Sequence, residues 1–345
     1  MATKGYSSYR GRAVGKTIAL AAALVAVIVA AAGYLIAQNY TVYDDDGTAH
    51  IELPFARKEK KDNRIDDVDL DIQKPEDMLH AVTLLQAQEL SDTALAQEDP
   101  AQILKDHPDS LVIPVKLING GITFDIAAQI PQQVGREKGD SLQNLKTLLA
   151  ADRYTVARLA CLCDSYFVRA YPDAAYSLKT GSYWYDAEGW TWLNPTNPET
   201  VSYLSTLCGE LSDLGFDEIM LDYFSYPIVG NTAAIGNMGL EDRVGTLQEL
   251  AATLRSQVSE ETVMSVVLRS DVSEEFGLSY EMLTTGFDRI YVEAGADMTA
   301  LMAQLPDGYD ATTRIVSVVN EMQEGNYVLR YQAPVYISRE ETAIP

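Results

Sequence analysis

A run of 21 uncharged residues near the N-terminus, Thr17 to Ala37, constrains this chain most strongly. About 20 apolar helical residues cover the hydrocarbon core of a bilayer. The run is longer than the ~7 to 15 apolar residues of a secretory signal peptide, and no small-x-small cleavage site follows it. We therefore expect a transmembrane helix at 17–37 rather than a cleaved signal peptide.

The charges on either side of this segment predict its orientation. Four basic residues and no acidic residue precede it, whereas an acidic run follows it at Asp44-Asp45-Asp46. Basic flanks remain in the cytoplasm. We expect a single-pass protein of the cell membrane with a cytoplasmic basic tail at 1–16 and the remainder extracellular.

Overall charge and cysteine content exclude several classes of partner. The chain has 26 Lys and Arg against 50 Asp and Glu, a net charge of −24, which disfavours nucleic acid as a partner. The three cysteines (161, 163 and 208) are odd in number and have no nearby histidine, so we expect buried thiols. The sequence indicates no metal and no organic cofactor.

The pattern of apolar residues predicts the domain organisation. Residues 38–75 are charged and contain few apolar positions, which is typical of a stalk or linker. From 76 to 345, short apolar or β-branched runs alternate with amphipathic helical stretches, the pattern of an α/β fold with parallel strands. Helices are clearest at 141–150, 199–214 and 242–258. The candidate strands are 79–85, 111–117, 155–162, 218–222, 263–268, 289–293, 314–319 and 327–331. Eight strands favour a (β/α)8 TIM barrel over an open sheet.

In such a barrel the functional site lies at the C-terminal ends of the strands. The last polar residues of the predicted strands are Lys116, Asp164, Asp222, Asp271, Glu293 and Glu321. Asp222 is the strongest candidate, because its strand points Glu218, Met220 and Asp222 into the barrel with Asp222 at the mouth. Glu218 lies about 13 Å away, farther than the ~5 to 9.5 Å that separate glycosidase carboxylates. The second carboxylate would therefore be Glu293 or Asp271.

The segment after the third strand is unusually aromatic and contains all three tryptophans, at 184, 190 and 192. Flat rings beside Asp, Asn and Gly suit a carbohydrate, whose C–H faces stack on aromatics. The same composition also fits a loop that packs its rings on itself. The sequence leaves both interpretations open.

Two motifs carry a family resemblance. The runs Tyr-Trp-Tyr-Asp-Ala-Glu-Gly-Trp-Thr-Trp-Leu-Asn-Pro (183–195) and Gly-Phe-Asp-Glu-Ile-Met-Leu-Asp-Tyr-Phe-Ser-Tyr-Pro (215–227) resemble a bacterial glycoside-hydrolase-like TIM-barrel domain family of uncharacterised function. The resemblance implies a carbohydrate substrate and an acidic residue at Asp222. It also extends to Arg158, Asp164, Trp184, Trp192 and Asn194, which with Lys116 and Tyr223 form the expected substrate-binding set.

This chain departs from the family pattern at three places. Lys116 is followed by Leu117 instead of an acidic pair, Ser225 replaces an arginine, and Val267 stands where an aspartate is expected. Glycoside hydrolysis needs two carboxylates in separate roles. We therefore expect either a glycoside hydrolase acting on a cell-wall or extracellular polysaccharide, with Asp222 as nucleophile or base and Glu293 or Asp271 as acid, or an inactive relative that binds carbohydrate or serves as an interaction module.

Overall fold

The computed structural model describes residues 41–43, 49–51, 79–107, 110–126, 139–239 and 242–332. The predicted tail, transmembrane helix and most of the predicted stalk lie outside these residues. None of the helices in the described ranges combines the length and apolar character needed to cross a membrane. The chain divides into two compact units. In the first, Met1–Asp71, the structure describes an antiparallel strand pair, β1 (Thr41–Tyr43) and β2 (Ala49–Ile51), which lies within the predicted stalk.

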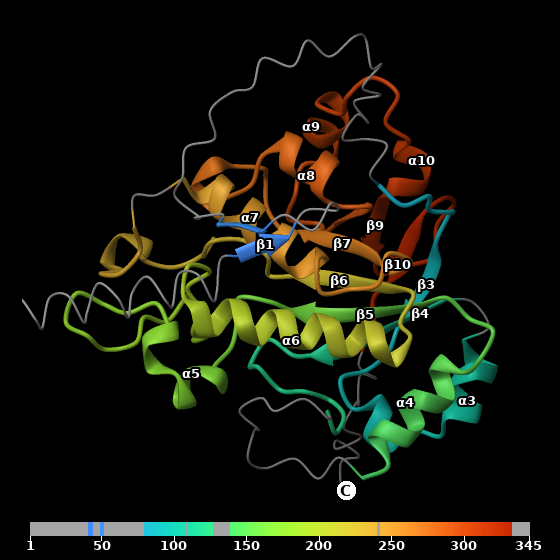
Figure 1. The fold of residues 1–345 in the computed structure, drawn as a ribbon. Helices are drawn as coiled ribbons and strands as arrows, with labels where there is room; N and C mark the ends of the chain where they lie inside the picture. Colours follow the sequence, from blue (N-terminus) through green and yellow to red (C-terminus); the bar gives the residue numbers. More distant parts are fainter. Residues whose placement is uncertain are drawn as a thin grey trace, which may run out of the picture. The chain divides into compact units, whose positions relative to one another are not determined.

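The second unit, Ile72–Pro345, contains a closed barrel of eight parallel strands, which confirms the predicted barrel (Figure 1). Each strand pairs with its neighbours along the chain, and the last strand pairs with the first. In chain order the strands are β3 (Gln86–Glu89), β4 (Ser110–Lys116), β5 (Thr155–Ala160), β6 (Glu218–Asp222), β7 (Val263–Leu268), β8 (Arg289–Val292), β9 (Ile315–Val319) and β10 (Tyr327–Leu329).

The first strand was expected at 79–85, and this placement is wrong. Most residues of this segment are exposed or half-buried, with Leu84 48% exposed and Leu85 buried, and the segment is held at the N-terminal end of the barrel. The backbone N–H of His80 donates to Asp288, and Arg314 donates to the His80 carbonyl. The strand begins at Gln86 and has the sequence Gln-Ala-Gln-Glu. Because three of these four residues are polar, the pattern of apolar residues did not indicate this strand.

Helices connect the strands. They are α2 (Ala94–Gln97), α3 (Pro100–Asp106), α4 (Ser141–Leu149), α5 (Phe167–Ala170), α6 (Pro198–Leu214), α7 (Arg243–Arg255), α8 (Tyr280–Gly286), α9 (Met298–Ala303) and α10 (Ala311–Arg314), with 3-10 turns η2 (Pro172–Ala174), η3 (Thr232–Ala234) and η4 (Glu274–Phe276). The predicted start of α6 is confirmed, because the Asn197 side chain accepts from the N–H groups of Glu199 and Thr200. Gly215, at φ 94°, ends the helix in the left-handed conformation that glycine tolerates.

Glu218 lies in the barrel interior, where three side chains satisfy it. The hydroxyls of Tyr154 and Tyr291 donate to its carboxylate at 2.8 and 2.6 Å, and Arg289 pairs with it. A buried carboxylate is tolerated only when it is paired and hydrogen-bonded in this way. Glu218 therefore has a structural role, as expected from its distance to the mouth.

Candidate functional site

Asp222 ends β6 at the barrel mouth, and two arginines enclose its carboxylate. Arg158, on β5, donates from Nε and Nη2 to Oδ2 at 2.9 and 2.6 Å. Arg269, directly after β7, donates from Nε to Oδ1 at 2.5 Å and from Nη2 to Oδ2 at 2.9 Å. The backbone N–H of Tyr223 donates to Oδ1 at 2.8 Å. Asp222 thus accepts five hydrogen bonds from protein donors.

These contacts determine the ionisation of Asp222. Burial opposes the charged form, but the positive charges of Arg158 and Arg269 outweigh it and hold the pKa of Asp222 well below its usual range. Burial lowers the pKa of each arginine, but the negative charge of Asp222 outweighs this effect and raises both pKa values above the ordinary value. Asp222 is therefore a fixed anion between two fixed cations.

Two further carboxylates join this cluster through the arginines. Nη1 of Arg158 pairs with Glu89 at the end of β3. Nη2 of Arg269 lies 3.6 Å from Oε1 of Glu293, after β8, and Arg330, after β10, pairs with the other oxygen of Glu293. Glu89 and Glu293 each share one guanidinium with Asp222. Arginines and carboxylates consequently alternate around the mouth.

Tyr223 has the only positive φ of a non-glycine residue in the described ranges, 51°. Strained backbone of this kind is concentrated at functional sites. The strained turn places the Tyr223 ring 4.0 Å from the Arg269 guanidinium carbon and edge-on to Trp192 at 5.9 Å. Burial raises the pKa of Tyr223 to about 12, so its phenol is neutral near pH 7. The ring fixes the plane in which Arg269 meets Asp222.

Three adjoining hollows form what we call the mouth groove. The central one, of about 490 Å³, is lined by Glu89, Leu90, Ser91, Asp92, Thr93, Arg158, Tyr223, Arg269, Arg330 and Tyr331. It shares Asp92, Arg158 and Tyr223 with a hollow of about 190 Å³ that reaches Lys116 and Asp222. It shares Glu89, Arg330 and Tyr331 with another of about 330 Å³ that reaches His107 and Asn320. The mouth is therefore an elongated groove rather than a single pocket.

Lys116 and Asp164 were expected to bind substrate, but the structure buries them against each other at 3.1 Å. Asp164 also accepts from two backbone N–H groups and from the Tyr203 hydroxyl. Lys116 donates to the carbonyls of Ala160 and Cys163 at 2.5 and 3.0 Å. The pair thus has its polar partners within the protein, although Lys116 lines the smallest of the three hollows.

The aromatic segment packs on itself. Trp184 and Trp192 are 2% and 1% exposed, and their indole N–H groups donate to the Asn231 carbonyl and the Asp186 carboxylate. Neither ring is open to a ligand in this arrangement, which corresponds to the self-packed interpretation rather than to an open sugar platform. Tyr185, in contrast, is 54% exposed.

The remaining predicted residues are dispersed. Asp271 is exposed and accepts from the Asp297 N–H, outside the mouth groove, and Glu321 is also exposed. Asn194 stabilises a turn by accepting from the N–H and hydroxyl of Thr196. Of the residues predicted from sequence, the structure brings together Asp222, Glu293, Arg158 and Tyr223.

Four residues of the cluster were missed from sequence: Glu89, Arg269, Arg330 and Tyr331. Glu89 was missed because its strand was placed too early. Arg269 and Arg330 directly follow strands, and Tyr331 comes one residue after Arg330, but the candidates taken from the strand ends were mainly acidic. Applying the strand-end rule to every polar or aromatic residue would have found them.

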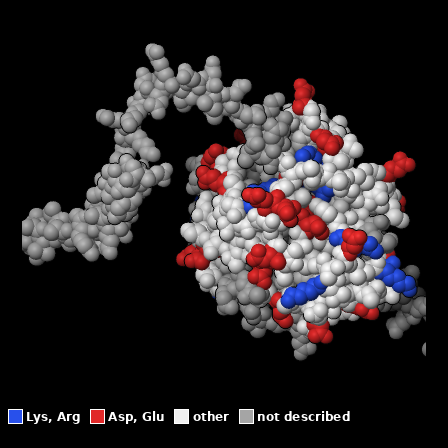
Figure 2. All heavy atoms as spheres, turned by 45° about the vertical axis from the view of Figure 1, so that its right-hand side comes forward, with Lys and Arg blue, Asp and Glu red and all other residues white. Residues whose placement is uncertain are grey.

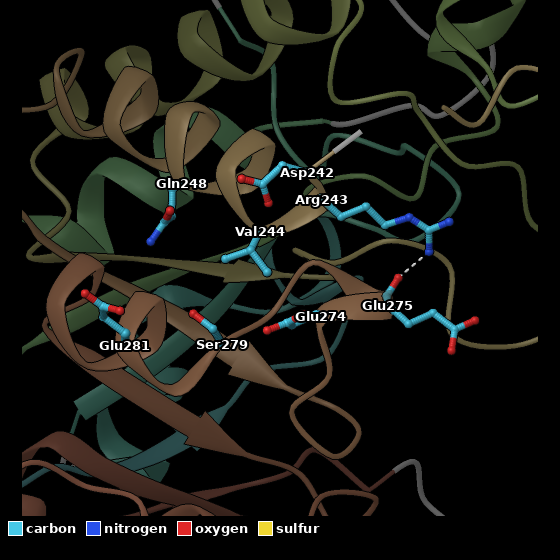
Figure 3. Close-up of a pocket in the computed structure, with 8 residues that line it drawn as sticks. All are labelled: Asp242, Arg243, Val244, Gln248, Glu274, Glu275, Ser279 and Glu281. Atoms are coloured by element: carbon cyan, nitrogen blue, oxygen red, sulfur yellow. Dashed lines mark hydrogen bonds between the residues drawn. The ribbon is translucent and has the colours of Figure 1, made fainter. Parts of the chain in front are cut away.

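A separate hollow of about 630 Å³ lies where α7 and α8 begin, beside η4 (Figure 3). Its charged lining comprises Asp242, Glu274, Glu275, Glu281 and Arg243. Arg243 donates to the Glu275 carbonyl at 2.5 Å. Asp242 and Ser279 cap the two helices, which accounts for two of its polar groups. Across the described part of the chain, no group of three or more His, Cys, Asp or Glu side chains could hold a metal ion.

Several solved structures resemble this chain at low sequence identity. A hypothetical protein from Ruminiclostridium thermocellum is 23% identical, with 53% of this chain and 96% of that chain covered and a TM-score of 0.45. The glycoside hydrolase domain of PgaB (BpsB) from Bordetella bronchiseptica is 14% identical, with 73% and 94% covered and a TM-score of 0.47. An α-galactosidase variant from Geobacillus stearothermophilus, in complex with stachyose, is 10% identical, with 72% and 39% covered and a TM-score of 0.48. No curated protein matches this sequence.

A family model described as "Putative glycosyl hydrolase domain" matches residues 84–286. The match covers more than half of the chain, from the residues before β3 to the end of α8. It includes Asp222, Arg158 and Arg269 at the mouth. The chain therefore belongs to this glycosyl hydrolase-like domain family.

Proposed function

We propose that this chain is a membrane-anchored protein of the cell exterior whose barrel mouth binds a cell-wall or extracellular polysaccharide without hydrolysing it. The observation that carries the proposal is the saturation of Asp222. Five protein N–H donors fill the carboxylate that the family places at the mouth.

A saturated carboxylate is poorly suited to glycoside hydrolysis. An ionised carboxyl offers about four lone-pair sites, and here Arg158, Arg269 and Tyr223 direct five donors at them. A nucleophile or general base needs a lone pair directed at the substrate or at a water molecule. Freeing one would break charge-assisted hydrogen bonds, which are about twice as strong as neutral ones. Binding requires no such rearrangement.

The mouth groove offers the groups that recognise sugars. Tyr331 is 39% exposed and can present a ring face to a pyranose. Ser91, Thr93 and the guanidinium groups supply donors for hydroxyls within the same hollow. The three adjoining hollows give the length that a polymer segment needs. These features support a glycan chain rather than a compact metabolite as the ligand.

Hydrolysis is the second candidate, and the positions of Glu89 and Glu293 favour it. Glu89 and Asp222 both pair with Arg158, and Glu293 and Asp222 both pair with Arg269. A single guanidinium therefore separates Asp222 from each of these carboxylates. Glycosidases need two carboxylates at such close range. In this case the substrate would have to displace an arginine from Asp222.

The proposed location rests on the sequence. The apolar segment at 17–37, the basic residues before it and the acidic run after it support a helix that leaves the barrel outside the cell. A reporter fused to the C-terminus would be active only in the exterior compartment. Reporter activity in the cytoplasm would contradict this orientation.

Binding is tested with the full-length chain in detergent against a panel of cell-wall and exopolysaccharide oligosaccharides. We expect saturable binding that weakens when Tyr331 is replaced by alanine. Absence of binding across the panel would contradict the proposal, and release of shorter sugars would favour hydrolysis.

A further inference from the structure

The charges that reach the surface of the mouth are mainly cationic. The side chains of Arg158, Arg269 and Arg330 are 22%, 22% and 38% exposed. Their carboxylate partners Glu89, Asp222 and Glu293 are only 7%, 1% and 11% exposed. A ligand entering the groove therefore meets guanidinium groups before it meets carboxylates.

These arginines also retain unused donors. A guanidinium has five N–H groups. Arg269 engages Nε and Nη2 with Asp222, and Arg330 engages Nη2 with Glu293. Within the described ranges, Nη1 of Arg269 and both Nε and Nη1 of Arg330 have no hydrogen-bond partner. The two arginines thus present unpaired N–H groups beside the central hollow, which both of them line.

The orientation of Arg269 is set before any ligand arrives. Asp222 holds one edge of its guanidinium, and the Tyr223 ring lies 4.0 Å from its central carbon. A planar fork held in this way matches the two oxygens of a carboxylate. The acidic residues lining the central hollow are Glu89, which is paired with Arg158, and Asp92. Asp92 also lines the hollow beside Lys116 but not the one beside His107, so it lies toward the end away from Arg330.

We propose that the mouth groove selects an acidic glycan, with a uronate carboxylate bound by the free N–H groups of Arg269 and Arg330. This inference rests on the proposed glycan binding and adds the ligand class. The rest of the protein argues against general attraction to polyanions, because the net charge is −24 and acidic side chains are scattered over the face in Figure 2. Selection must therefore come from the arginines at the mouth.

The test is calorimetric titration of the full-length chain in detergent with trimers of galacturonate, glucuronate and mannuronate. Each is compared with its carboxyl-reduced neutral counterpart. We expect at least one uronate trimer to bind about tenfold more tightly than its neutral form. Replacement of Arg330 by glutamine should abolish this preference, and Arg330→Lys should restore only part of it, because lysine keeps the charge but loses the fork.

Arg169→Gln is the matched control. Arg169 also lies over a tyrosine ring, that of Tyr166 at 4.8 Å, but it does not line the mouth groove. This variant should retain the preference for the uronate. Equal affinity for acidic and neutral trimers would overturn the acidic selection while leaving glycan binding intact. A preference that persists in Arg330→Gln would overturn the assigned site. Failure of every trimer to bind would overturn the acidic selection, whereas absence of binding across the wider oligosaccharide panel is the result that contradicts glycan binding itself.

Discussion

Arg269 holds both oxygens of Asp222, with Nε 2.5 Å from Oδ1 and Nη2 2.9 Å from Oδ2. Arg158 approaches the same carboxylate from the other neighbouring strand. The Asp222 carboxylate is therefore the centre of an ion-pair cluster rather than a free reactive group. Sequence alone could not indicate this, because the contacts join residues far apart in the chain.

The cluster makes barrel stability dependent on Asp222 and on pH. The folded-state pKa of Asp222 lies below its usual range, so its ionised form stabilises the fold above the unfolded value of about 3.9. This contribution is lost as pH falls through the folded value. At pH 7, Asp222→Asn should destabilise the barrel by on the order of 3–5 kcal/mol, because two partly buried arginines lose their partner.

Thermal unfolding of the wild type and Asp222→Asn at a series of pH values checks this prediction. The difference in Tm should be largest at neutral pH and shrink below about pH 4. A difference that stays constant from neutral pH down to strongly acidic pH would show that the charge of Asp222 contributes little.

Gly120 is required by the buried Asp164. It has φ +91°, and a Cβ placed there would lie 1.9 Å from Oδ1 of Asp164. Gly120→Ala should lower the free energy of unfolding by more than the ~1–3 kcal/mol typical of backbone strain alone. Gly181→Ala is the matched control, since Gly181 has φ +89° and a Cβ at that position would have nothing within 4 Å. Equal losses measured by chemical denaturation would mean that the Asp164 contact is unimportant.

Tyr331 is the aromatic side chain that we expect to stack on a sugar ring. Tyr331→Ala should weaken oligosaccharide binding by about three- to tenfold, the range for loss of one aromatic contact. Tyr185→Ala removes a ring that is 54% exposed but does not line the mouth groove, and it should leave affinity unchanged. The same loss in both variants, measured by calorimetry, would argue against a specific role for Tyr331.

Trp192 should affect stability rather than ligand binding. Its indole N–H donates to Oδ2 of Asp186 at 2.8 Å inside the packed segment. Trp192→Phe removes that donor and should cost about 1–3 kcal/mol of unfolding free energy while preserving glycan affinity. A large loss of affinity in a stably folded variant would instead support Trp192 as a sugar platform.

The sequence predicted the architecture well because alternation of apolar runs and helical stretches is a local property. The bounds of β6 and β7 matched their predicted ranges, and Asn197 began α6 as expected. The prediction of the first strand was wrong because the apolar residues at 79–85 resemble a strand pattern, whereas most of them are exposed or half-buried and the paired strand begins at the polar Gln86.

The site was only partly predictable. The strand-end rule found Asp222 and Glu293, and the family resemblance added Arg158 and Tyr223. Neither the strand-end rule nor the resemblance could reveal that Lys116 and Asp164 pair with each other in the interior, or that Trp184 and Trp192 are buried. Those outcomes depend on which side chains meet after folding, and strand position alone does not encode them.

Product analysis with a bound oligosaccharide tests the central claim most directly. The full-length wild type and Asp222→Asn would each be incubated with the tightest-binding oligosaccharide, and its length followed by mass spectrometry. Our account predicts that the wild type binds the oligosaccharide and returns it intact. Shorter products that form with the wild type would contradict it, and their loss in an Asp222→Asn variant that is folded and still binds the oligosaccharide would establish Asp222 as a catalytic residue.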